Sequence, residues 1–414
     1  MDAGAGMRPS TRSVMFGLVA LLLVAACLRP AITAIGPLLD EIDADTGLGS
    51  TALGVLGAVP LLCFAAVSPW IHRPAARFGA QHMVLVAMLV LTAGILLRSL
   101  PGAVWLWVGT IAIGVGIGIG NVLLPAIVKR DHPTRISTVT GVYSSVTTGA
   151  AGLGSGLAVP FLALTGNWRG ALALWAVVSL LAAVVWTVRG RVLPSPPPAS
   201  AAATSGASMW RSATAWQVTA FMGLQSTTFY LLVTWLPSVE TSLGVDRATA
   251  GWHLSVYQVV GIVAGLGATA LMGRRSDQSL LTAVAASILV VAMIGLLWAP
   301  SLVLLWVLVA GMSSGATFII AVSLFGLRTR TIAQTAQLSG MAQCIGYLLA
   351  ASGPVVAGAI FDLTGTWTVV LVLVAVCSAA QAVVGAFAGR ARYTHDGTPG
   401  EGSGNPGSGA DRVS

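Results

Sequence analysis

The sequence has very little charge. Only 8% of its 414 residues are charged, 56% are hydrophobic, and the mean hydropathy is +0.88. Because soluble domains carry about 25% charged residues, this composition excludes an ordinary soluble enzyme. The net charge is +8, but the chain has no lysine- or arginine-rich face that could follow phosphates, so no nucleic-acid partner is expected. The composition indicates an integral protein of the lipid bilayer.

Several chemical motifs are also missing. The four cysteines lie inside apolar stretches without a CxxC pair, and the five histidines lack metal-ligand spacing, so neither disulfides, a metal nor another cofactor is expected. The sole lysine, Lys129, does not follow a glycine as a nucleotide-binding P-loop requires, which argues against ATP as a partner. The spans contain no acid/base or nucleophile pair for catalysis, so the sequence does not predict an enzyme.

Apolar runs long enough to cross a membrane occur twelve times. A hydrocarbon core of about 30 Å requires about 20 apolar helical residues. An all-α membrane protein with twelve transmembrane helices is therefore predicted. The expected spans are 13–39, 50–71, 82–98, 103–128, 138–163, 170–188, 214–238, 250–272, 280–298, 301–326, 334–361 and 366–388.

The connections between these spans alternate in charge. Arg73 and Arg77 follow the second span, for example, whereas Asp40 and Glu41 follow the first. Cytoplasmic loops of membrane proteins are enriched in arginine and lysine. Both termini are therefore expected on the cytoplasmic side of the cytoplasmic membrane, which requires an even number of spans.

The chain divides into two similar halves. The segment LTGNW at 164–168 resembles LTGTW at 363–367, and Pro37 corresponds to Pro237. Two parallel six-helix repeats are typical of a transporter that rocks about a central site. The expected organisation is a cytoplasmic N-terminus at 1–12, a six-helix bundle at 13–188, a Pro/Ala/Ser linker at 189–213, a second bundle at 214–390 and a disordered tail at 391–414.

Arg29 lies near the middle of the first span. An arginine at this depth costs about 2.5–3.5 kcal/mol on insertion scales, and no aspartate or glutamate is expected inside any span to offset its charge. A bound anion would supply the missing counter-ion, with bidentate geometry available to the guanidinium. The alternative is a packing role, in which backbone carbonyls and water satisfy the arginine.

Further polar residues lie on spans that are expected to face the same cavity. Buried polar groups need partners, which a substrate or a neighbouring helix can supply. Together with Arg29, the candidate substrate-binding residues are Thr33, Asn121, Tyr143, Gln225, Tyr230, Tyr257, Gln258, Gln343 and Tyr347.

Three motifs resemble a known group of transporters. Residues 28–33 (LRPAIT) with 36–38 (GPL), residues 120–125 (GNVLLP) and residues 221–226 (FMGLQS) are similar to the cyanate-permease and nitroimidazole-permease branch of the major facilitator superfamily. The resemblance covers nearly all of residues 13–390. It implies alternating access, a monomer, and transport of small anions or small nitro-aromatic compounds.

The leading hypothesis is a secondary active transporter of a small, cyanate-like anion that binds at Arg29. One alternative is efflux of small neutral or weakly acidic drug-like compounds such as nitroimidazoles. A different class of alternative is a membrane sensor that does not transport.

Overall fold

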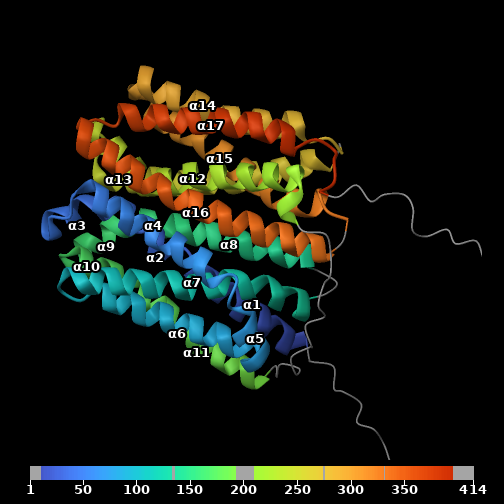
Figure 1. Ribbon diagram of the computed structural model, residues 1–414. Helices are drawn as coiled ribbons and strands as arrows, with labels where there is room; N and C mark the ends of the chain where they lie inside the picture. The colour runs from blue at the N-terminus through green and yellow to red at the C-terminus, as the bar shows by residue number, and fades with distance from the viewer. Residues whose placement is uncertain (1–10, 133–135, 193–208, 274–275, 331, 395–414) are drawn as a thin grey trace, which may run out of the picture.

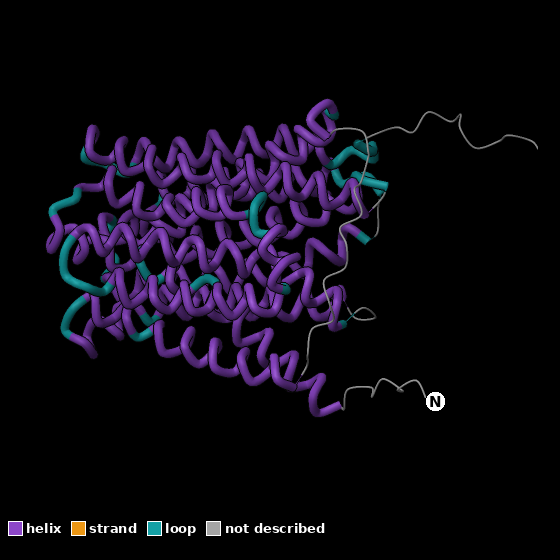
Figure 2. Tube along the Cα trace, turned by 60° about the horizontal axis from the view of Figure 1, so that its bottom comes forward, coloured by secondary structure: helices purple, strands orange, loops and turns teal. Residues whose placement is uncertain are grey.

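The computed structural model describes residues 11–132, 136–192, 209–273, 276–330 and 332–394, and within these ranges all regular structure is helical (Figure 2). The helices form one bundle, in which the two halves of the chain lie on opposite sides (Figure 1). Most of the predicted N-terminal segment, linker and tail lies outside the described residues. The bundle confirms the predicted all-α class.

The described part of the first half contains twelve helical elements, several of which combine into one span. They are α1 (Thr11–Cys27), α2 (Pro30–Thr33), η1 (Gly36–Leu38), α3 (Leu39–Thr46), α4 (Gly49–Val67), α5 (His72–Phe78), α6 (Ala80–Arg98), α7 (Ala103–Asp131), α8 (Ile136–Gly156), α9 (Ala158–Thr165), α10 (Trp168–Ala173) and α11 (Trp175–Val192).

The second half has longer, less interrupted helices. They are η2 (Met209–Arg211), α12 (Ala213–Ser242), α13 (Arg247–Met272), α14 (Ser279–Trp298), η3 (Pro300–Leu302), α15 (Val303–Leu327), α16 (Ile332–Thr364) and α17 (Thr368–Ala388).

Ten helices among the described residues are long and apolar enough to cross a membrane, or eleven if α8 and α9, which meet at a 46° bend, form one span. The seventh predicted span corresponds to α12, which has the length but carries the polar run 225–228. The count of twelve and the cytoplasmic termini remain predictions.

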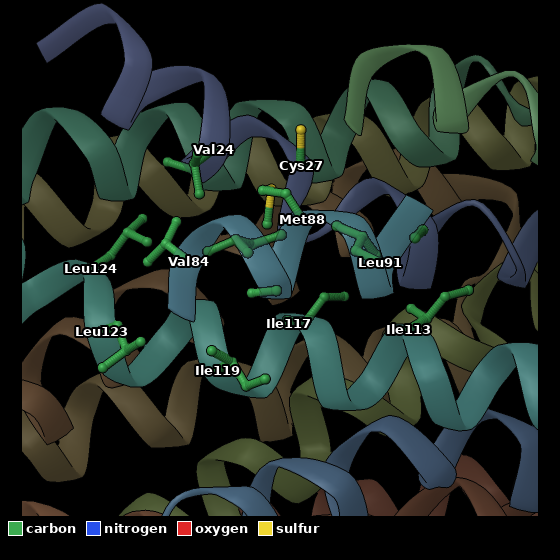
Figure 3. Close-up of a cluster of buried hydrophobic side chains, with 14 of the residues drawn as sticks. Val24, Cys27, Val84, Met88, Leu91, Ile113, Ile117, Ile119, Leu123 and Leu124 are labelled. Atoms are coloured by element: carbon green, nitrogen blue, oxygen red, sulfur yellow. The ribbon is translucent and has the colours of Figure 1, made fainter. Parts of the chain in front are cut away.

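Apolar side chains from α1, α6 and α7 interlock in the first half. Figure 3 shows Val24, Met88 and Ile117 from these three helices facing one another, and all three side chains are fully buried. The same cluster extends to Tyr230 and Tyr347 of the second half. Because lipid is as apolar as these side chains, the close packing itself supplies much of the attraction between helices.

The two ends of the bundle differ in charge. The acidic end is defined here by Asp40, Glu41, Asp246 and Asp362, and the basic end by Arg189, Arg328 and Arg390. Helix α1 begins and helix α17 ends at the basic end (Figure 1). The positive-inside rule predicts that this end faces the cytoplasm.

Polar contacts close the acidic end between the two halves. The carboxylate of Asp362 in α16 accepts hydrogen bonds from the backbone N–H groups of Ser50, at 3.2 Å, and Thr51, at 2.8 Å, at the start of α4. Arg247 at the start of α13 pairs with Glu41 and with Asp40 of α3.

Direct helix packing extends this closure. The Ser255 hydroxyl of α13 donates to the Gly152 carbonyl of α8 at 2.6 Å. Gly54 of α4 lies so close to the Pro354 carbonyl of α16 that a side chain there would collide with it. The conformation is therefore one in which the halves are joined at the acidic end.

Two of the three arginines that define the basic end, Arg189 and Arg328, are buried. Arg189 is completely buried and bonds to Asp131 and to Gln81, the latter at 2.9 Å. The α11 helix that carries Arg189 continues to Val192, beyond the predicted end of the sixth span.

The start of the predicted tail is also structured. The backbone N–H of Thr394 donates to the Arg328 carbonyl at 2.8 Å, and its carbonyl accepts from the Ser212 hydroxyl at 2.7 Å. Thr394 thus connects the start of the predicted tail to Arg328 and Ser212. The remainder of the tail lies outside the described residues.

Candidate substrate-binding site

The first span is broken near its middle. Helix α1 ends at Cys27 and α2 begins at Pro30, which has no N–H to donate to the preceding turn. Pro37 repeats the interruption in η1. Arg29 stands in the first break with φ of −126° and ψ of −38°, outside the helical region. Two prolines thus place the arginine on irregular backbone within the bundle.

A second arginine supports this irregular backbone. The Arg98 guanidinium donates from Nη1 to the Ala31 carbonyl at 2.8 Å. In a regular helix the Ile35 N–H would donate to the Ala31 carbonyl, but here it donates to the Ile32 carbonyl at 3.3 Å. The predicted third span ends at Arg98, and only 1% of the surface of this residue is accessible. It therefore stabilises the segment that carries Arg29.

The Arg29 side chain reaches across to the second half. Its Nη1 donates a hydrogen bond to the Tyr230 hydroxyl of α12, and Tyr347 of α16 lies close to the same guanidinium. No described carboxylate lies within ion-pair distance of Arg29. The guanidinium thus links the two halves through the Tyr230 phenol oxygen, and no described carboxylate neutralises its charge.

Aromatic rings surround this contact. The Tyr230 and Tyr347 ring centroids are 6.4 Å apart at an angle of 74°, which is an edge-to-face arrangement. The row continues through Phe64 of α4, 5.7 Å from Tyr347, and through Phe229, 5.1 Å from Tyr230 and 6.3 Å from Tyr257. A continuous aromatic row therefore runs from the first half into the second beside Arg29.

Two predicted site residues lie on packing surfaces instead. The Thr33 hydroxyl is 2.7 Å from the Ala151 carbonyl and only 2% of the residue is exposed, so it joins α2 to α8. Tyr143 is partly buried against the apolar core of the first half. These contacts favour helix packing at both positions.

The four predicted amides divide into two groups. Gln225 accepts a hydrogen bond from the adjacent serine, and Gln343 donates to a serine one turn earlier in its own helix. The amide nitrogens of Asn121 and Gln258 are buried and have no hydrogen-bond partner among the described residues. Because unpartnered buried donors are costly, these two amides are the better candidates for contact with a ligand.

Three side chains with notable positions in the bundle were absent from the predicted site residues. Phe64 and Phe229 are ordinary apolar residues in the sequence, and only the packing shows that they continue the aromatic row. Glu240 lies outside the predicted seventh span, 214–238, yet it is fully buried in α12. The sequence signal for this burial was that Glu240 lies only two residues beyond the predicted end of the seventh span.

Comparison with known families identifies the chain. The model of the Major Facilitator Superfamily matches residues 21–351. The chain belongs to the major facilitator superfamily. It is accordingly a multi-pass membrane transporter of small molecules and not an enzyme.

Two relatives refine this placement within the superfamily. The 2-nitroimidazole transporter of Escherichia coli is 40% identical over 89% of this chain and 94% of its own length. The cyanate transport protein of the same organism is 25% identical over 84% of this chain and 91% of its own length. These matches confirm the predicted nitroimidazole- and cyanate-permease branch.

Solved structures agree with the superfamily fold. A bacterial homologue of the human lysosomal transporter Spinster, in an inward-facing and occupied conformation, matches with a TM-score of 0.73 at 14% identity. The match covers 92% of this chain and 96% of the other. At this identity the likeness supports the fold alone.

Proposed function

We propose that this transporter moves a small planar solute that carries a pair of acceptor oxygens, as a nitroimidazole does. The observation that carries the proposal is the bridge from Arg29 to Tyr230, with the Tyr347 ring beside it. A nitro group matches the paired N–H donors of a guanidinium, and a flat heterocycle suits edge-to-face contact with the surrounding rings. The similarity to the 2-nitroimidazole transporter supports the same class.

The bridge also suggests how solute binding would act on the two halves. Arg29 belongs to the first half, whereas both tyrosines belong to the second. A solute that takes the guanidinium donors replaces this bond between the halves. Binding would then shift the balance between conformations by its different affinity for each, as alternating access requires.

A small anion such as cyanate is the second candidate. It is favoured by the absence of any described carboxylate beside Arg29, since a buried cation without a counter-ion attracts an anion. The 25% identity with the cyanate transport protein points in the same direction. The two candidates share Arg29 and differ in their need for the aromatic row.

Counterflow in proteoliposomes tests the proposal. Vesicles loaded with unlabelled solute are diluted into labelled 2-nitroimidazole, cyanate or imidazole, the last of which lacks the nitro group. The proposal predicts exchange of 2-nitroimidazole but not imidazole, and loss of exchange in Arg29→Gln. The control is Arg211→Gln, at an exposed arginine of η2.

The outcomes separate the candidates. Exchange of cyanate without exchange of 2-nitroimidazole would favour the anion. Exchange of imidazole as fast as 2-nitroimidazole would contradict recognition of the nitro group. No exchange of any solute by correctly inserted protein would contradict both candidates and point to a different solute.

A further inference from the structure

Glu240 is a completely buried carboxylic acid outside the site described above. It lies near the end of α12, and its Oε2 is 2.5 Å from Nδ1 of His253 in α13. Its Oε1 has no hydrogen-bond partner among the described residues. The His253 side chain keeps 13% of its surface exposed, and the described part of the chain offers no other ion-pair contact between a carboxylate and an imidazole.

This pair lies beside the contact between the two halves. Glu240 is one helical turn beyond Pro237, which packs against η1 of the first half. On α13, the neighbours of His253 make the other contacts: Trp252 lies against Gly156, and Ser255 bonds to Gly152. Separation of the halves at the acidic end would therefore open the region next to the pair to water.

Hydration of the pair would change how tightly it holds its proton. With one shared proton the pair is neutral overall, either as acid and imidazole or as carboxylate and imidazolium. Loss of the proton leaves a negative charge buried in an apolar surrounding, which is strongly unfavourable. The closed conformation therefore retains the proton, whereas a hydrated pair can release it.

The other charged side chains at the acidic end have partners of their own, and the charge of Asp246 also acts on His253. Hydrogen bonds from the Thr249 side chain and backbone lower the pKa of Asp246, which caps α13 and stays ionised as the pair titrates. Two ion-pair groups occupy other charges at the acidic end: Arg247 pairs with Asp40 and Glu41, and Arg169 pairs with Asp45. The remaining carboxylates accept backbone hydrogen bonds, Asp362 from the start of α4 and Asp43 from the Gly49 N–H.

We propose that Glu240 and His253 form a proton-binding site that couples solute movement to a pH gradient. This inference rests on the transport function proposed above and adds the coupling ion to it. Arg29 and the aromatic row bind the solute, and the pair exchanges its proton with the aqueous phase at the acidic end. Solute binding and proton exchange use the same conformational change, because both sites lie next to the contact between the halves.

Two transport modes in one preparation test the coupling. Glu240→Gln keeps the shape and can still bond to His253, but it cannot exchange a proton. The variant should retain counterflow of 2-nitroimidazole or cyanate, which needs no net proton movement. It should lose accumulation or extrusion driven by an imposed pH gradient, and His253→Gln should behave in the same way. Asp277→Asn, at an exposed carboxylate of the basic end, should keep both modes.

Infrared difference spectroscopy tests proton binding without any solute. Purified wild-type protein is compared between about pH 5 and about pH 9. We expect a titrating carboxyl or imidazole signal that is absent from Glu240→Gln and present in Asp277→Asn. This measurement stands even if counterflow shows that the proposed solutes are wrong.

Two results would overturn the coupling site. One is gradient-driven transport in Glu240→Gln at the wild-type level. The other is an infrared titration that is identical in the wild type and in Glu240→Gln.

Discussion

The bond from Asp362 to the start of α4 gives a quantitative prediction about conformational balance. In the closed acidic end, this carboxylate caps a helix of the opposite half through the N–H groups of Ser50 and Thr51. Leu48, at the capping position itself, supplies no side-chain bond. Asp362→Ala therefore removes the cap of α4 only in the conformation in which the halves are joined.

The magnitude follows from capping energetics. Loss of a capping side chain costs about 0.5–2 kcal/mol, and loss of a negative charge near a helix N-terminus costs about 0.3–1 kcal/mol. Asp362 is solvent-exposed, so screening places the total near about 1–2 kcal/mol, a factor of about 5–30. An open population of about 1% would rise to about 5–25%.

Spin-label distances measure this population directly. Labels at Leu164 of the first half and Leu243 of the second lie on exposed positions, with 75% and 41% of their surfaces accessible. In a background without the four native cysteines, Asp362→Ala should enlarge the long-distance component, whereas Asp277→Ala should leave it unchanged. Equal distance distributions in the wild type and Asp362→Ala would refute the reasoning, as would an equal shift in the control.

Two further predictions concern the stability of the bundle. Arg98→Met should lower the thermal unfolding temperature in detergent, because it leaves the Ala31 carbonyl without a partner at a cost of about 1–3 kcal/mol. An unchanged unfolding temperature would contradict the stabilising role of Arg98. Gly315→Ala should also destabilise the protein, by about 1–3 kcal/mol, because the new methyl group would collide with the Gly261 carbonyl where α13 and α15 touch. Gly326→Ala, where the structure leaves open space, is the matched control for the second variant.

Much of the fold could be predicted because its main signals are local. Long apolar runs specify membrane-spanning helices, and the prolines at positions 30 and 37 predict interruptions of the first span. The placement of Arg29 near the middle of that span also followed from counting residues. Its two tyrosine partners were among the predicted site residues, but nothing local linked them to it.

The remaining features depend on contacts between distant segments. Arg98 and Glu240 lie close to the predicted ends of their spans, where counting alone cannot distinguish an exposed loop from a buried last turn. Thr33 resembles a cavity residue because it follows Arg29 by one turn, yet close approach of α8 directs its hydroxyl to a backbone carbonyl. Such distinctions require the positions of neighbouring helices.

The central claim is that Arg29 binds the transported solute. Its most direct test is equilibrium binding of 2-nitroimidazole and cyanate to purified wild-type protein, Arg29→Gln and Arg211→Gln. Loss of a charge-assisted hydrogen bond costs about 1.5–3 kcal/mol, so the account predicts binding of the preferred solute about 10–150-fold weaker in Arg29→Gln. It predicts unchanged binding in Arg211→Gln. Wild-type affinity in a folded Arg29→Gln protein would contradict the claim and leave this arginine a purely structural role.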